Sequence, residues 1–345
     1  MVMDTQKTQK MKFGGKEFLN NCSFFLRLIK LELNITGEDS ILLIDIMENK
    51  YNDLLILYNS RLDYFISCFE KRGIRTKRTY KKSSFLSRVL RRTFEALNFS
   101  QDFWYGDWKR DLSSFKTVII FADSYFPVLK FIKGNNRDIR IIYWYWDPVF
   151  RLRLPKKIIF ETAEIWSFDP SDCLKFGFKF NTTFYFSNIF LPKNTPEYDV
   201  IFVGNDKGRM EYLQKIRVRL TKLGIKGYYH VIPDRQEHEK KQRKEIPYVE
   251  YLKIVSRTRV LIDLIPFGQS GLTIRAMESI FFNKKLITND PFIINQNFYT
   301  RENIFILGKD NGEKLRDFIN SPYKQLDNKI VKSYDVSNWL KRFNI

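Results

Sequence analysis

Short apolar runs that alternate with helix-forming segments are the feature that most limits how this chain can fold. Such runs occur at 118–122 (VIIFA), 139–144 (IRIIYW), 164–168 (EIWSF) and 260–264 (VLIDL). Strands whose residues are nearly all apolar are typical of parallel sheets, because helices cover both faces of such sheets. The alternation therefore predicts an α/β protein.

The same alternation occurs twice, on either side of a polar segment with two prolines at 191–197 (LPKNTPE). We expect a Rossmann-like, doubly wound domain at 41–190 and a second one at 198–325, facing each other across a cleft. The chain length of 345 residues agrees with two domains, since one core rarely serves so many residues.

Periodicity places individual elements in these domains. In the first, an apolar run at 41–46 (ILLIDI) predicts the opening strand, and helical spacing predicts a helix at 54–71. A further strand is predicted at 183–186. In the second, a helix is predicted at 270–282, directly after the strand at 260–264 and its turn.

The chain ends lie outside the predicted domains. Residues 1–40 are expected to form a polar tail and a short amphipathic helix at 22–33, and 326–345 a C-terminal helix that packs back on the first domain. The helix at 22–33 either packs on the protein or lies on an anionic membrane surface. The basic segment at 81–97 (KKSSFLSRVLRRTFEAL) has two interpretations as well, a membrane or nucleic-acid contact or a solvated helix face.

The composition limits which classes of partner, metal site and membrane segment can be expected. The formal net charge of +20 favours anionic partners, namely nucleic acid, an acidic membrane surface or phosphorylated substrates. Three widely spaced cysteines and two histidines, with no CxxC pattern, predict neither a disulfide framework nor a zinc site. No apolar stretch of about 18 residues is present, so a cytoplasmic protein without a transmembrane helix is expected.

Two glycine-containing turns follow strands of the predicted second domain. The first is a turn at 268–273 before a helix, and the unpaired N–H groups of a helix start can bind an anion. Its candidate ligand-binding residues are Gly268, Gln269, Ser270, Gly271, Leu272 and Thr273, followed on the helix by Arg275 and Glu278. The alternative is a structural turn capped by Ser270 or Thr273, with Glu278 solvated.

The second turn follows the strand predicted at 198–203. Its candidate residues are Gly204, Asn205, Lys207 and Arg209, of which the last two could neutralise a phosphate. The turn matches neither the Walker pattern nor GxGxxG, and the region has no DxD, so neither a dinucleotide cofactor nor a metal is predicted. The alternative is a surface turn with solvated basic side chains.

Further candidates lie near the same predicted edge. Asp147 follows the strand at 139–144 and is the candidate general base, with a turn-capping role as the alternative. Arg235 could reach the site from the strand near 228–231. Tyr248 and Tyr251 could stack on a base, or could simply be buried tyrosines of a helix.

Several of these segments resemble a known family. YDVIFVG at 198–204, PYVEYL at 247–252 and DLIPFGQSGLTIRAMESIFFNKKLITN at 263–289 resemble the donor-nucleotide domain of GT-B glycosyltransferases. They are most similar to bacterial polysaccharide-biosynthesis proteins related to the spore-maturation protein CgeB. IIYWYWDP at 141–148 and EIWSFDPSD at 164–172 resemble the first domain more loosely, so the resemblance covers residues 41–310.

The resemblance implies transfer of a sugar from a nucleotide-sugar to a glycan or lipid-linked acceptor, as in lipopolysaccharide or capsule biosynthesis. It implies that Glu278 binds the donor ribose and that the 268–273 turn faces the diphosphate or the sugar. Many retaining members carry a glutamate where this chain has Ser270, so retention and inversion both stay open. Two alternatives remain: a non-catalytic sugar- or nucleotide-binding protein of the same fold, and a basic nucleic-acid-binding protein.

Overall fold

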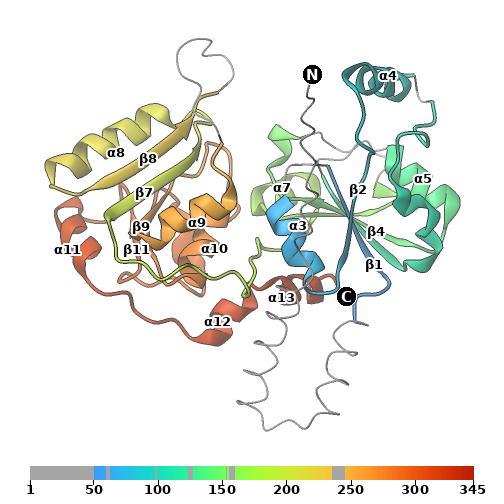
Figure 1. Cartoon of the computed structure of the whole chain (residues 1–345). Coiled ribbons are helices and arrows are strands. Elements are labelled where there is room, and N and C mark those ends of the chain that lie inside the picture. Colours follow the sequence, from blue (N-terminus) through green and yellow to red (C-terminus); the bar gives the residue numbers. More distant parts are fainter. Residues whose placement is uncertain are drawn as a thin grey trace, which may run out of the picture. The chain divides into compact units, whose positions relative to one another are not determined.

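The structure is a computed structural model that describes residues 50–59, 63–97, 99–122, 127–152, 154, 160–234 and 245–345 (Figure 1). Residues Asp53–Ile345 form one compact unit, which contains every element considered below. The strand predicted at 41–46, the helix predicted at 22–33 and the candidate Arg235 lie outside the described residues.

The first sheet has six strands in the order β2-β1-β3-β4-β5-β6, and all neighbours pair in parallel (Figure 1). The strands are β1 (Leu54–Tyr58), β2 (Arg75–Arg78), β3 (Thr117–Phe121), β4 (Arg140–Tyr145), β5 (Glu164–Ser167) and β6 (Lys179–Phe180). The helices that connect them are α3 (Asp63–Glu70), α4 (Phe85–Ala96), α5 (Pro127–Asn135) and α7 (Pro170–Phe176).

The second sheet has five parallel strands in the order β11-β10-β9-β7-β8. Its strands are β7 (Tyr198–Asn205), β8 (Gly227–Ile232), β9 (Thr258–Asp263), β10 (Lys285–Thr288) and β11 (Ile304–Ile306). Its helices are α8 (Met210–Lys222), α9 (Tyr248–Ser256), α10 (Ile274–Phe281) and α11 (Leu315–Asn320). Alternate residues of β7 and β9 share a core with Leu213 and Leu220 of α8, and their neighbours in the strands are buried as well.

Two parallel sheets with helical connections confirm the predicted α/β fold and are compatible with two Rossmann-like domains. Both sheets start with the same strand order, in which the first strand lies between the second and the third. The order therefore reverses between β1 and β3 in one sheet and between β7 and β9 in the other. Ligands of such sheets bind beyond the carboxyl ends of the strands at this reversal.

Two element predictions are wrong. The helix predicted at 54–71 is strand β1 followed by helix α3, because the five apolar residues LLILY fit a buried strand as well as a helix. The strand predicted at 183–186 is an irregular segment in which Tyr185 forms a single bridge to Asp335. Tyr185 and Phe186 are buried and Phe184 is half-buried, and the rings of Phe184 and Phe186 pack against Phe69 instead of forming a strand.

The end of the chain packs against the first sheet. Helices α12 (Asn328–Ser333) and α13 (Val336–Lys341) follow α11. The Trp339 ring lies 5.4 Å from that of Trp144 on β4 and 4.3 Å from Phe184, and it is fully buried. A buried aromatic side chain of this size removes enough apolar surface to stabilise the fold by roughly 4–6 kcal/mol before entropy is counted. No helix among the described residues combines the length and the apolar composition needed to cross a bilayer.

Candidate functional site

The turn after β7 is held in an unusual backbone conformation. Lys207 and Gly208 both have positive φ, 52° and 75°. A lysine in this left-handed region costs about 1 kcal/mol, and such strain is concentrated at functional sites. Asp206 stabilises the turn, because its carboxylate accepts hydrogen bonds from the backbone N–H groups of Arg209 (2.8 Å) and Met210 (2.6 Å). The Lys207 side chain therefore projects from a turn that hydrogen bonds hold in place at the end of β7.

Arg209 joins the two strand ends at the sheet reversal. Its buried guanidinium donates to the backbone carbonyls of Asn205, Asp206 and Leu264, so it connects the turns after β7 and β9. Burial, and then the neighbouring charge of Arg275, lower the pKa of Arg209 to about 10. The predicted phosphate-binding residue thus also has a structural role.

Arg275 lies on the first turn of α10 and faces the same strand ends. It donates to the backbone carbonyl of Val203, and its Nη1 lies 3.6 Å from Oδ1 of Asp263. A Cβ atom on Gly204 would stand 2.5 Å from the Arg275 guanidinium, so this glycine makes room for the arginine. Burial raises the pKa of Asp263, and the Arg275 charge opposes that shift.

Lys207 brings the candidate general base into the same site. Its Nζ lies 3.7 Å from Oδ1 of Asp147, which follows β4 of the first sheet. Burial lowers the pKa of Lys207, while the Asp147 charge raises it. In the described part of the chain, the Asp147 carboxylate forms this ion pair and no turn-capping hydrogen bond.

A fourth cation, Arg151, was not predicted. It lies four residues after Asp147 at the end of a short 3₁₀ helix (Val149–Arg151), and its charge lowers the pKa values of both Lys207 and Arg209. Its Nε is buried and has no hydrogen-bond partner among the described residues. An unpaired buried donor costs about 1–3 kcal/mol, which a bound acceptor would recover. We call Arg151, Lys207, Arg209 and Arg275 the cationic cluster.

The 268–273 turn differs from its prediction. Helix α10 begins at Ile274 with Thr273 as its N-cap, so Ser270 precedes the helix. The N–H groups of Ser270 (2.8 Å) and Gly271 (3.2 Å) donate to the Asp169 carboxylate, and so does the Ser270 hydroxyl. The expectation that these amides are free for a diphosphate is therefore wrong for this structure, because a buried carboxylate of the same chain occupies them.

Asp169 was missed as a site residue. It follows β5, and its carboxylate also caps α7 by accepting from Ser171 N at 2.9 Å. The sequence Asp169-Pro170 is a recognisable helix start, with proline in the first turn. Nothing in that local signal indicates a second partner about a hundred residues later.

The other residues of the turn form contacts within the protein, some local and one to a distant segment. The Gln269 side chain donates to the Gly271 carbonyl at 3.1 Å, and the Leu272 carbonyl accepts from the Thr183 hydroxyl at 2.6 Å. The Thr273 hydroxyl donates to Asp263 at 2.6 Å. Gly268 has φ 83°, which favours glycine.

Glu278 is fully buried, so the alternative of a solvated glutamate is wrong. Its carboxylate accepts from the hydroxyls of Tyr248 (2.5 Å) and Tyr251 (2.6 Å), and Tyr248 is bonded in turn to Tyr185. Burial raises the pKa of Glu278 to about 7, against the lowering effect of the two tyrosine bonds. A ribose contact stays a prediction, and it requires the fully buried carboxylate to become accessible to the ligand.

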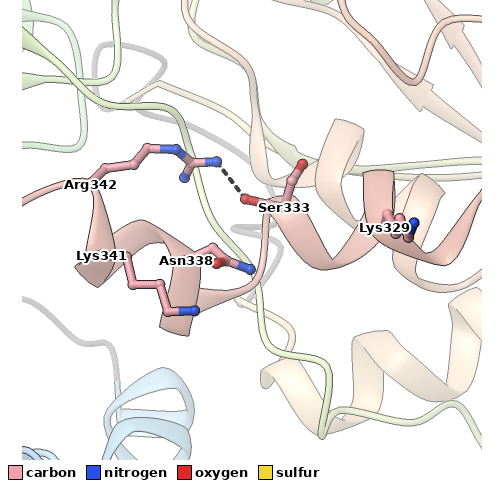
Figure 2. A pocket seen from close by; sticks show the side chains of 5 residues that line it. All are labelled: Lys329, Ser333, Asn338, Lys341 and Arg342. Atoms are coloured by element: carbon pink, nitrogen blue, oxygen red, sulfur yellow. Dashed lines mark hydrogen bonds between the residues drawn. The ribbon is translucent and has the colours of Figure 1, made fainter.

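A surface hollow of about 410 Å³ lies elsewhere, on α12 and α13 (Figure 2). It is lined by Lys329, Ser333, Asn338, Lys341 and Arg342. The Ser333 hydroxyl and the Asn338 amide donate to backbone carbonyls, and Arg342 donates to the Ser333 carbonyl. Its lining residues form no hydrogen bond or ion pair with the cationic cluster, which lies at the sheet reversal where ligands of parallel sheets bind.

Comparison with known proteins adds no identification. No protein-family model matches this chain, and no curated protein matches it.

Proposed function

We propose that the chain is a GT-B glycosyltransferase, which transfers a sugar from a nucleotide-sugar to a glycan or lipid-linked acceptor. In this proposal it acts on the cytoplasmic side in the synthesis of bacterial surface polysaccharide. The observation that carries the proposal is the cationic cluster at the β7/β9 reversal, in contact with Asp147 of the other sheet.

The cluster has the chemistry to hold a diphosphate. Lys207 and Arg151 are only partly buried, and Arg151 has an unpaired N–H donor. Arg209 and Arg275 add positive charge from fixed positions, because backbone carbonyls hold their guanidinium groups. Preorganised cations stabilise the negative charge that develops on a leaving diphosphate.

Asp147 supplies the other half of the reaction. A diphosphate competes with Asp147 for Lys207, so donor binding releases the carboxylate for the acceptor. Asp147 then takes the proton of the acceptor hydroxyl, whose oxygen forms the new bond to the anomeric carbon. The bond from that carbon to the diphosphate oxygen breaks, and its electron pair leaves with the diphosphate. These steps together invert the configuration at the anomeric carbon.

A thermal-shift panel of UDP, GDP, CDP, CMP and ADP tests the proposal. A ligand at 100 times its Kd stabilises a protein by about 2.7 kcal/mol, so one nucleotide should raise the melting temperature of the wild type. Lys207→Met should reduce that shift. Lys215→Met is the matched control, because Lys215 pairs with Glu211 on the exposed side of α8. The proposal fails if no nucleotide stabilises the protein or if both variants respond like the wild type.

One observation favours a second candidate, a non-catalytic nucleotide-binding protein of the same fold. Asp169 occupies the turn amides that the family resemblance assigns to the donor. Turnover separates the two candidates, because a non-catalytic protein would bind a nucleotide but release none from a nucleotide-sugar, with or without an acceptor.

A further inference from the structure

Among the described residues, helix α4 contacts the rest of the protein through one face. The indole N–H of Trp104 donates to the Ser87 hydroxyl at 2.8 Å, and the Phe94 ring packs 5.1 Å from the Trp104 ring. The Arg91 guanidinium lies 3.7 Å above the Tyr80 ring. Ser87, Arg91 and Phe94 are four and three residues apart, so they share one side of the helix.

The opposite side of α4 is apolar and exposed. Phe85, Leu86, Val89 and Leu90 are 70%, 77%, 45% and 51% exposed, and Leu97, just after the helix, is 58% exposed. At about 100° per residue these side chains fall within an arc of roughly 140°, centred away from the attached face. A helix on a globular protein normally has the reverse arrangement, with its apolar stripe toward the core. We call these five residues the outward apolar face.

Basic side chains border this face. Arg88 and Arg92 lie one turn apart along its edge, and Lys81 and Lys82 precede the helix; all four are exposed. None of the four pairs with an acidic residue in the described part of the chain. Glu95, the one acidic residue of α4, lies on the far side of Arg88 and Arg92 from the outward apolar face.

An exposed apolar face with a border of basic side chains fits an anionic lipid surface. We propose that α4 docks the protein on an anionic lipid bilayer, with the outward apolar face in the headgroup–acyl boundary and the four cations on lipid phosphates. Apolar side chains and bordering cations are the two attractions that hold an interfacial helix, and each basic residue near an anionic surface adds to the second. The inference rests on α4 alone and does not depend on the proposed transferase activity.

Vesicle binding by the full-length protein tests the docking surface. The wild type is expected to co-sediment with phosphatidylcholine vesicles that contain phosphatidylglycerol, and far less with phosphatidylcholine alone. Leu86→Glu/Leu90→Glu should lower the affinity at least about tenfold, because both side chains leave the boundary and two negative charges enter it. Arg88→Ser/Arg92→Ser should lower it by about thirtyfold at low salt.

The matched control is Leu174→Glu/Val218→Glu, which adds the same charge at exposed apolar positions on α7 and α8. It should bind vesicles nearly as well as the wild type. The proposal is overturned if the wild type ignores anionic vesicles, or if the α4 and control variants lose binding equally. Phe25→Glu/Leu28→Glu alters the apolar side of the helix predicted at 22–33, and the proposal is also overturned if only this variant abolishes binding. A conversion of dimer to monomer by Leu86→Glu/Leu90→Glu, measured by sedimentation, would overturn it too, because the face would then bind a second copy of the chain.

Discussion

Lys207 Nζ lies 3.7 Å from Asp147 Oδ1, although the two residues follow strands of different sheets. Their side chains are 32% and 36% exposed, and an ion pair with that much water contact contributes little stability. A ligand with two phosphates can therefore take Lys207 from Asp147 at low cost. The pair couples the proposed donor site to the proposed base.

Asp147→Asn is expected to reduce sugar transfer by about 10²–10⁴-fold, the usual contribution of a general base. Nucleotide binding should persist, because the cationic cluster is intact. Initial rates with nucleotide-sugars of the nucleotide identified by thermal shift measure the first effect, and the shift itself measures the second. Asp138→Asn, at an exposed position on the same domain, should leave both unchanged. An Asp147→Asn enzyme with normal rates would remove Asp147 from the mechanism.

Asp169→Ala is expected to destabilise the protein by about 2–4 kcal/mol, because it leaves the N–H groups of Ser270 and Gly271 without their acceptor and uncaps α7. Urea unfolding measures this loss. Asp169→Asn retains one acceptor oxygen and should lose less. The exposed Glu313→Gln should change the free energy of unfolding by under about 0.5 kcal/mol. A loss no larger than that in Asp169→Ala would contradict the assigned contacts.

Glu278 makes stability depend on pH in an unusual direction. Its folded-state pKa is about 7 against 4.5 for an ordinary glutamate, so the folded protein keeps a proton that the unfolded chain has released. The stabilisation from this group is fully present below pH 4.5 and is lost as the pH rises to about 7, a change of about 3 kcal/mol.

The measurement compares wild type with Glu278→Gln in urea at about pH 5 and about pH 8. The wild-type free energy of unfolding, relative to the variant, should be higher at the lower pH. Tyr251→Phe removes a hydrogen bond that lowers the Glu278 pKa, so it should move the loss to higher pH. An identical difference at both pH values would show that Glu278 titrates normally.

Local sequence patterns were sufficient for most of the sheet framework. Four predicted strands correspond to β3, β4, β5 and β9, namely those at 118–122, 139–144, 164–168 and 260–264. Short apolar runs bounded by turn residues usually form buried strands. LLILY at β1 was misassigned since its pattern has no period that distinguishes strand from helix. Thr183–Phe186 was misassigned because aromatic packing, which depends on distant Trp339, buries it without a strand partner.

The sequence predicted some residues of the site but not others. Lys207, Arg209 and Arg275 were identified because they follow strand ends of one sheet, where chain order and strand order predict proximity. No local pattern marks Arg151 as a site residue. The pattern around Asp169 predicts its role as the N-cap of α7 but not its contact with Ser270. Asp147 was expected at an edge, but its partner belongs to the other sheet.

The sequence by itself determined a chain of two parallel sheets, with glycine turns and basic residues at the strand ends, because periodicity and turn chemistry act over a few neighbouring residues. Only the tertiary structure decided which groups meet. It placed Asp169 on the amides of Ser270, Asp147 beside Lys207, and the apolar side of α4 away from the protein. Such pairings depend on how distant segments pack, and hydrogen-bond and charge partners 60 or 101 residues apart leave no trace in the local sequence pattern.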